Sequence, residues 1–207
     1  MDFAVAFPGG RLLEYYEKEH LYLVDGVIVP SVTQVLGKVY GDKYTGVDTA
    51  VLKRAADHGT RVHEAIEKYC KTGIEEPIDE VHNFKFLQEK YGFRVLANEL
   101  PVIIDIDGLT MAGRLDMVVE MNGKIGGADI KSVSAMDKER TGMQLNLYRI
   151  GYKQSYGVEW DFLRGIQLKG NIRRFTALPI NPEYTIEKVK EYKDECGCYD
   201  RQTDKGH

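Results

Sequence analysis

The chain has 207 residues, of which 43% are hydrophobic, and this length and composition predict a globular protein with a sizeable core. Its 28 lysines and arginines are offset by 32 aspartates and glutamates, so overall charge does not indicate a nucleic-acid partner. Any anionic partner must then be bound by a local group of cations or by a metal. No stretch reaches the roughly 20 apolar residues of a membrane span and no secretion signal is recognisable. We therefore expect no membrane association and a cytoplasmic location.

The N-terminal half predicts a short strand pair followed by helices. Residues 20–30 place an Asp-Gly pair, typical of a two-residue hairpin turn, between two apolar runs. A short helix is expected after Ser31, a residue type that often caps helix N-termini. Two further helices are expected over residues 59–72 and 79–91, each ending directly before a glycine.

In the second half the periodicity changes from that of helices to that of strands. Residues 93–133 predict three or four consecutive strands, with turns at an Asp-Gly and an Asn-Gly pair. A helix is expected over residues 143–157, then a hairpin around a Gly-Asn pair and a last helix over residues 182–196. This order predicts an α+β (mixed α/β) fold, with one central mixed sheet flanked by helices, in a single domain.

The hairpin around residues 122–123 brings two acidic side chains together. If its turn is of type I′, Asp116 faces Asp129 with Cβ atoms about 5 Å apart, which is destabilising for like charges unless a cation lies between them. Lys131 shares the face of Asp129 because side chains two apart in a strand point the same way. The two glycines at residues 126–127 leave open a β-bulge that would shift this register by one residue.

Two carboxylates beside a lysine are typical of a site for a hard divalent cation. Mg²⁺ and Mn²⁺ bind carboxylate oxygens and keep several waters, often together with a substrate phosphate. Such an ion activates bound water and neutralises charge on a phosphoryl group, while a lysine can orient the attacking water. The pattern therefore favours phosphodiester hydrolysis. Spacing alone also allows the acids to be solvated residues on an exposed sheet face, one of them paired with the lysine.

At these positions the sequence resembles the PD-(D/E)XK nuclease superfamily, in particular its RecB-like, phage-type exonuclease branch. Each motif is short, but four of them occur in the order of that branch, on the predicted elements. The motifs are GTRVHEAIE at residues 59–67, GRLD at 113–116, DIK at 129–131 and QLNLY at 144–148. PSVTQVL at residues 30–36 also resembles phage-encoded members.

The resemblance implies a metal site and assigns its ligands. Asp116 and Asp129 would hold the ion, with the backbone carbonyl oxygen of Ile130 as a further ligand. His63 would be the additional imidazole ligand of the RecB-like branch, and its place at the edge of the helix's apolar stripe is compatible with this role. A lone histidine there could also be a hydrogen-bonded boundary residue.

The resemblance also implies catalytic and DNA-binding residues. Lys131 would position the attacking water, and Glu99 would bind a second metal or that water, unless it is a plain strand-edge glutamate. Gln144 and Tyr148 are one helical turn apart, so both face the same way, and they would line the DNA-backbone side of the site. Arg114 would contact a DNA phosphate. Packing of Tyr148 within an amphipathic helix is the alternative.

The implied fold is a restriction-endonuclease-like domain spanning residues 1–207, with residues 1–58 as an N-terminal elaboration and residues 59–200 as the nuclease core. The implied function is a Mg²⁺- or Mn²⁺-dependent DNA exonuclease of recombination or DNA end processing, acting by in-line attack of water. A structure-specific or single-strand endonuclease, or a non-catalytic DNA-binding or assembly module, remains the alternative. Strand polarity, the preferred metal, a homo-oligomer and a single-strand annealing protein as partner stay open.

Two cofactors found elsewhere among nucleases are not expected. Iron–sulfur members of the branch use one cysteine before the histidine helix and three near the C-terminus. Here Cys70 follows the histidine and only Cys196 and Cys198 lie late, so we expect no cluster, and an odd number argues against a disulfide scaffold. No phosphate-binding Gly-x-x-x-x-Gly-Lys-Ser/Thr motif is present, so no ATP is expected.

Overall fold

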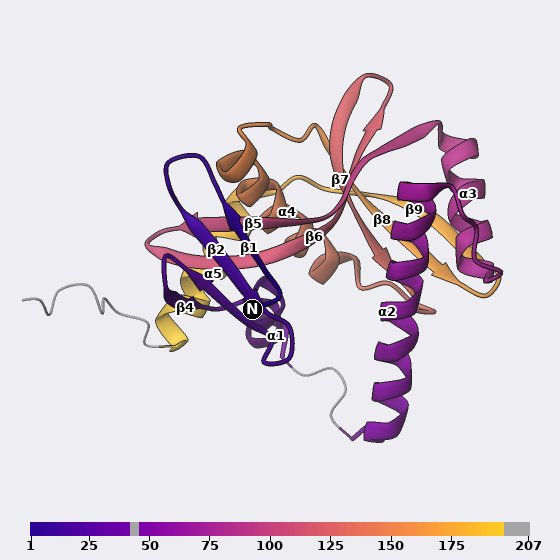
Figure 1. The fold of residues 1–207 in the computed structure, drawn as a ribbon. Helices are drawn as coiled ribbons and strands as arrows, with labels where there is room; N and C mark the ends of the chain where they lie inside the picture. The colour runs from indigo at the N-terminus through magenta and orange to yellow at the C-terminus, as the bar shows by residue number, and fades with distance from the viewer. Residues whose placement is uncertain (42–45, 197–207) are drawn as a thin grey trace, which may run out of the picture.

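The computed structural model describes residues 1–41 and 46–196, which form two β-sheets and five helices (Figure 1). The larger sheet has the strand order β5-β6-β7-β8-β9, and only β7 and β8 run parallel. Its strands are β5 (Phe93–Ile106), β6 (Leu109–Met121), β7 (Lys124–Lys131), β8 (Phe162–Lys169) and β9 (Ile172–Leu178). The predicted α+β fold with a central mixed sheet is confirmed.

The smaller sheet is formed by the N-terminal residues and contains four antiparallel strands. They are β1 (Phe3–Ala6), β2 (Leu12–Tyr16), β3 (Leu21–Val24) and β4 (Val27–Val29). The hairpin β3–β4 was predicted from its Asp-Gly turn, whereas β1 and β2 were not. Strands of four and five residues are too short for an alternating pattern to be distinguished from chance.

The five helices agree with the prediction except at the starts of the second and the fourth, the latter beginning at Lys138 rather than at residue 143. They are α1 (Val32–Tyr40), α2 (Thr49–Thr72), α3 (Asp79–Tyr91), α4 (Lys138–Tyr156) and α5 (Pro182–Cys196). Ser31 caps α1 and forms a capping box with Gln34. Helix α2 begins at Thr49, where Asp48 caps it, rather than at residue 59. The predicted boundary between the N-terminal elaboration and the core, after residue 58, therefore falls inside a continuous helix.

Of the two late cysteines, Cys196 ends α5 and Cys198 lies outside the described residues.

Helices cover both faces of the larger sheet. Helices α1, α4 and α5 share one apolar core with the sheet, while α2 and α3 share a second core on its other face. Helix α4 connects the parallel strands β7 and β8, as a parallel pair requires. The smaller sheet packs through a third core against Ile103 of β5 and Ala112 of β6. Figure 1 shows this sheet and the α2–α3 pair at opposite ends of the long strands β5 and β6.

Strand β6 presents the side chains directly before and after Asp116 to different cores. Residues two apart in a regular strand share a face, yet Leu115 packs with α1, α4 and α5 whereas Met117 packs with α2 and α3. The neighbouring strand β5 is irregular at the same level, because its register shifts after Val95 and Glu99 has a positive φ of 53°. A non-glycine residue in this left-handed region is strained, and such strain often marks a functional site.

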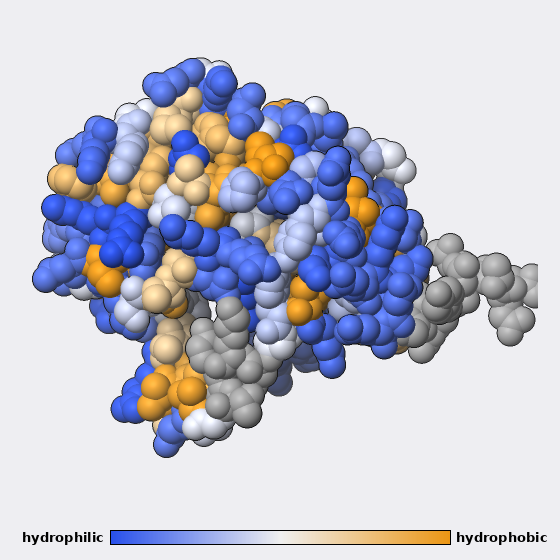
Figure 2. Space-filling model, turned by 180° about the vertical axis from the view of Figure 1, so that it is seen from behind, coloured by the Kyte–Doolittle hydropathy of each residue, from blue (hydrophilic) through white to orange (hydrophobic). Residues whose placement is uncertain are grey.

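Helix α2 extends well beyond the body of the protein. Its first buried residue is Val62, so the preceding turns pack against little else, and Val51 is exposed. Figure 2 shows hydrophobic surface on this projecting end, at the lower left. Within the described residues, each helix is either too short or too polar to cross a membrane.

Candidate active site and metal centre

Three carboxylates lie side by side on three adjacent strands. The β5–β6 pairs on either side place Glu99 opposite Asp116. The last β6–β7 pair, Met117 with Ala128, brings Asp116 beside Asp129 at the next position. Side chains opposite one another across adjacent strands share a face, so three acids of the same charge gather at one level of the sheet. This row is the starting point of the site.

The hairpin register that creates this row is the predicted one. Asn122 and Gly123 both have positive φ values, 54° and 72°, as a type I′ turn requires. Pairing is continuous through Gly126 and Gly127, so the possible bulge is absent. These positions need glycine for another reason, because an added Cβ would lie 2.5 Å from the Phe162 ring and 2.0 Å from the Trp160 ring. Their glycines allow close packing and do not mark a register shift.

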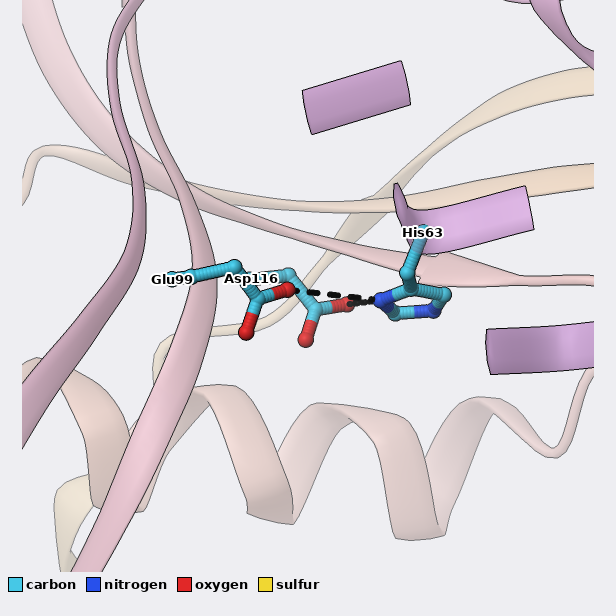
Figure 3. A group of neighbouring side chains, drawn as sticks. All are labelled: His63, Glu99 and Asp116. Carbon is cyan, nitrogen blue, oxygen red and sulfur yellow. Dashed lines mark ion pairs between the residues drawn. The ribbon is translucent and has the colours of Figure 1, made fainter. Parts of the chain in front are cut away.

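His63 from α2 closes the row on one side (Figure 3). Its Nδ1 atom lies 3.6 Å from Glu99 Oε1 and 3.7 Å from Asp116 Oδ2. One donor atom from each of the three residues lies within 4.8 Å of the others. Bonds of about 2.1 Å to a central ion place opposite donors about 4 Å apart, so this group is close to the dimensions of a metal site.

This donor group differs from the predicted ligand set. Glu99, expected at a second metal or the water, lies with His63 and Asp116, while Asp129 is set back behind them. The Ile130 carbonyl oxygen, a predicted ligand, lies 3.1 Å from His63 Nε2, and the Ile130 N–H donates to Asp116 Oδ2 at 2.8 Å. Ile130 thus contacts two of the candidate ligands directly.

Asp129 is 1% exposed, and Lys131 is its one polar partner in the described part of the chain. Lys131 Nζ lies 2.7 Å from Oδ2, whereas Oδ1 is buried without a partner among the described residues. Burial raises the pKa of the Asp129 carboxyl, and the Lys131 ammonium only partly opposes this shift. A buried carboxylate with unused acceptors is unfavourable on its own, and a cation in front of it would remove that penalty.

Lys131 is held in place from two elements. Its Nζ atom contacts Asp129 on β7 and donates a hydrogen bond to Gln144 Oε1 on α4 at 3.0 Å. Burial opposes the charge of Lys131, but the carboxylates of Asp129 and Asp116 outweigh burial and raise its pKa. Lys131 therefore stays protonated, which suits it to orient water or to stabilise negative charge, and not to accept a proton.

His63 also carries a proton when no metal is present. Burial lowers its pKa, but the carboxylates of Asp116, Glu99 and Asp129 outweigh that effect and raise the pKa to about 9. The imidazolium thus takes the place of a cation among the acids. An incoming metal ion would displace this proton, because a histidine ligand must be neutral.

Arg114, expected to contact DNA, is engaged within the site. Its Nε atom lies 2.7 Å from Glu99 Oε2, and its guanidinium lies 6.0 Å from the centre of the Tyr15 ring. Its strand neighbour is Pro101 of β5, because the β6–β7 pairing ends before this point. Arg114 therefore balances the charge of Glu99 at the rim of the site.

Gln144 and Tyr148 project from α4 toward the same cavity, as predicted from their spacing. Both are buried, and the Tyr148 ring passes directly over Gly113. A Cβ at Gly113 would lie 2.8 Å from the Tyr148 ring and 3.2 Å from Val32. The glycine three residues before Asp116 is thus needed for α4 to approach the sheet, a reason that the sequence alone does not reveal.

The predicted site residues line one cavity of about 540 Å³, except Asp129 and Ile130. Those that line it are His63, Glu99, Arg114, Asp116, Lys131, Gln144 and Tyr148. The cavity walls come from α1, α2, α4, β5, β6 and β7, and also from the smaller N-terminal sheet. Tyr15 on β2, Tyr22 on β3 and two residues of the turn between them, Glu17 and His20, were not predicted to belong to the site. Their signal would have been the hairpin β2–β3, whose first strand was not predicted.

No protein-family model and no curated protein sequence matches this chain. A solved structure of similar arrangement is the crystal structure of SSO0001, with 12% sequence identity and a TM-score of 0.46. The match covers 81% of this chain and 75% of that one. Similarity at this level carries no functional argument, so function must be inferred from the site itself.

Proposed function

We propose that this protein is a metal-dependent deoxyribonuclease, in particular an exonuclease acting in recombination or DNA end processing. The observation that carries the proposal is the row of Glu99, Asp116 and Asp129 on adjacent strands, with His63 and Lys131 against it. Three acids together are destabilising unless a cation joins them. Metal-assisted hydrolysis of a phosphodiester uses both such a cation and an oriented water.

The donor set fits a hard divalent ion. Carboxylate oxygens of Glu99 and Asp116 suit Mg²⁺ or Mn²⁺, and His63 supplies one nitrogen. Asp129 lies next to this group and adds negative charge from behind. A bound ion of this kind supplies a water of lowered pKa and an electrophile for a phosphoryl oxygen. These residues would hold it against the scissile phosphate.

The remaining residues act through position and charge. Lys131, fixed between Asp129 and Gln144, would orient the attacking water in line with the leaving 3′ oxygen, whose departure would leave the 5′ phosphate that the family resemblance implies. Its ammonium would also stabilise the charge that develops on the phosphoryl oxygens. Gln144 and Tyr148 would contact the DNA backbone from the opposite wall of the cavity. Polar contacts of this kind position a substrate without reading its sequence.

A non-catalytic DNA-binding module with this fold is less consistent with the buried state of Asp129. A carboxylate that is almost fully buried, with the Lys131 ammonium as its one polar partner in the described part of the chain, is costly to keep charged. A purely structural protein has no use for that arrangement, whereas a metal site does.

The test uses linear duplex DNA and covalently closed circular DNA, each incubated with the protein and Mg²⁺, Mn²⁺ or EDTA. We expect degradation of linear DNA alone, abolished by EDTA and by Lys131→Ala. Lys124→Ala is the matched control, because Lys124 is exposed at the other end of the same strand. Cutting of circles would instead indicate an endonuclease. Binding without cleavage in any metal would overturn the proposal in favour of a DNA-binding module.

A further inference from the structure

A second surface with unusual chemistry lies outside the catalytic cavity. We call it the arginine–aromatic stripe and define it as Phe86, Tyr91, Arg164, Arg173 and Phe175. Phe86 and Tyr91 belong to α3, and the other three residues belong to β8 and β9. None of the five lines the cavity that holds Glu99, Asp116 and Lys131.

The strand register places the stripe on one face of the sheet. In the β8–β9 pair, Phe175 lies opposite Ile166 and Arg173 opposite Leu168, and Arg164 precedes Ile166 by two residues. Ile166 and Leu168 belong to the core beneath α2 and α3, so Arg164 and the two β9 residues point to that same side. The stripe thus runs along the edge of the sheet next to α3.

Within the stripe, cations and rings are in direct contact. The Arg173 guanidinium lies 3.7 Å from the centre of the Phe86 ring, and that of Arg164 lies 5.5 Å from the centre of the Phe175 ring. The Tyr91 and Phe175 ring centres are 4.9 Å apart. Phe86 and Tyr91 are 37% and 38% exposed, so part of each ring is accessible to a ligand.

The two arginines have no carboxylate within ion-pair distance in the described part of the chain. Four arginines of the described chain, at 11, 94, 114 and 149, form ion pairs and so are less free to bind an external anion. The chain carries four more acidic than basic residues, so partners for Arg164 and Arg173 are not scarce. Each donates one hydrogen bond to a neutral acceptor, Arg173 to Asn83 Oδ1 at 3.4 Å and Arg164 to the Leu163 carbonyl oxygen at 3.1 Å. Both positive charges therefore remain available to an external anion.

A partner for this stripe must be anionic and must also offer flat apolar surfaces. Duplex DNA is anionic, but its bases are stacked on one another and cannot reach a surface ring. A single strand presents phosphates to cations and free bases to rings. We propose that the arginine–aromatic stripe binds single-stranded DNA. The identity of this strand rests on the proposed function: it is the strand left unpaired when the exonuclease removes its complement.

The test measures the anisotropy of a labelled oligothymidylate and of a duplex of equal length, in EDTA so that proposed cleavage cannot occur. We expect Phe86→Ala to weaken single-strand binding about tenfold, with an unchanged dependence on salt. Arg173→Ala should weaken it and reduce the slope of log affinity against log salt by about 0.7, as for one lost phosphate contact. Arg94→Ala is the matched control, because Arg94 is exposed but paired with Glu120.

Unchanged single-strand affinity of both stripe variants would overturn the inference and would point to an acidic protein surface as the partner. Equal losses on duplex and single strand would also overturn it, because stacking on free bases would then play no part. The linear-DNA cleavage assay separates this outcome from that of the nuclease proposal. Binding through the stripe without any DNA cleavage would contradict the nuclease proposal alone. DNA cleavage with unaltered binding by the stripe variants would contradict the stripe proposal alone.

Discussion

Lys131 and Asp129 form an ion pair at 2.7 Å in which the carboxylate is almost fully buried and the ammonium faces the cavity. The pair links the rear of the site to its front, because Lys131 also donates to Gln144. Charge in the site is therefore balanced before any metal binds, by Lys131 against Asp129 and by His63 and Arg114 against Glu99 and Asp116.

Removing one member of this pair should damage both stability and activity. Lys131→Met leaves a buried carboxylate without its cation, so we expect about 3 kcal/mol of destabilisation near pH 8. Cleavage should fall at least about 100-fold because charge stabilisation is lost. The double variant Lys131→Met, Asp129→Asn should regain most of the stability and none of the activity. Urea unfolding and a DNA cleavage assay measure both, and equal stability of the single and double variants would show that the two residues are not coupled.

Stability of the metal-free protein should fall as the pH rises through the titration of His63. Its pKa is about 9 in the folded protein, above the ordinary 6.5, so protonation favours the folded state. This contribution is fully present below pH 6.5 and is lost as the pH rises toward and through 9. Urea unfolding in EDTA should show the decline in the wild type and a flatter profile in His63→Gln. Parallel profiles would mean that the imidazolium does not interact with Asp116 and Glu99.

Metal affinity should show the opposite pH dependence. A divalent ion must displace the proton of His63, so Mn²⁺ binding should strengthen as the pH rises from 6.5 toward 9. The wild type and His63→Gln are compared by titration calorimetry, and the variant should lose most of this dependence. An unchanged pH profile in the variant would exclude His63 as a ligand.

Glu99 should contribute to metal binding and not merely pair with Arg114. Glu99→Gln keeps the size of the side chain and removes its charge, so we expect Mn²⁺ affinity to fall at least about tenfold. Loss of the Glu99 charge weakens its ion pairs with Arg114 and His63 but also removes its repulsion by Asp116, so stability should change little. Glu120→Gln is the matched control, because Glu120 forms an exposed ion pair with Arg94 elsewhere on the same two strands. Full metal affinity in Glu99→Gln would assign the carboxylate to Arg114 alone.

Gly113→Ala should disturb the site through packing. The added methyl group would meet the Tyr148 ring at 2.8 Å, so α4 or the ring must move, at about 1–3 kcal/mol in stability. Gly142→Ala on α4 meets no atom within 4 Å and should be neutral or slightly stabilising. Thermal unfolding of the two variants distinguishes them. If Gly113→Ala is as stable as the wild type, Tyr148 is not closely packed against β6.

Local rules predicted the hairpin but not the grouping of its acids with His63. An Asn-Gly pair selects a type I′ turn, and that turn alone determines that Asp116 lies beside Asp129. The Asp107-Gly108 turn places Glu99 opposite Asp116 by the same rule, because the β5–β6 register is continuous from that turn past residue 99. No periodic pattern encodes the left-handed backbone at Glu99. The motif resemblance names Glu99 as a candidate, and the fold brings it to His63 on a distant helix.

The N-terminal region shows a different kind of failure. The sequence pattern predicts that a helix begins at Gly59, whereas the helix begins at Thr49 and continues through this glycine. The glycine is used for contact instead, since an added Cβ would lie 3.4 Å from Ser132 Oγ at the end of β7. Glycine weakens a helix only slightly, so tertiary contacts can override its preference. The role of Gly113 is equally invisible in the sequence, because this glycine is needed only for close packing of the Tyr148 ring.

The Asn122-Gly123 turn also limits how this gene can tolerate insertions and deletions. Exposed turn tips usually accept an extra residue with little effect. Here a change of one residue leaves Asp129 beside Asp116 only if the turn becomes a three-residue loop that keeps the inner pairs. If β7 instead slid past β6 by one step, Asp129 and Lys131 would move to the opposite side of the sheet, and the chemistry would be lost without a change to any residue of the site.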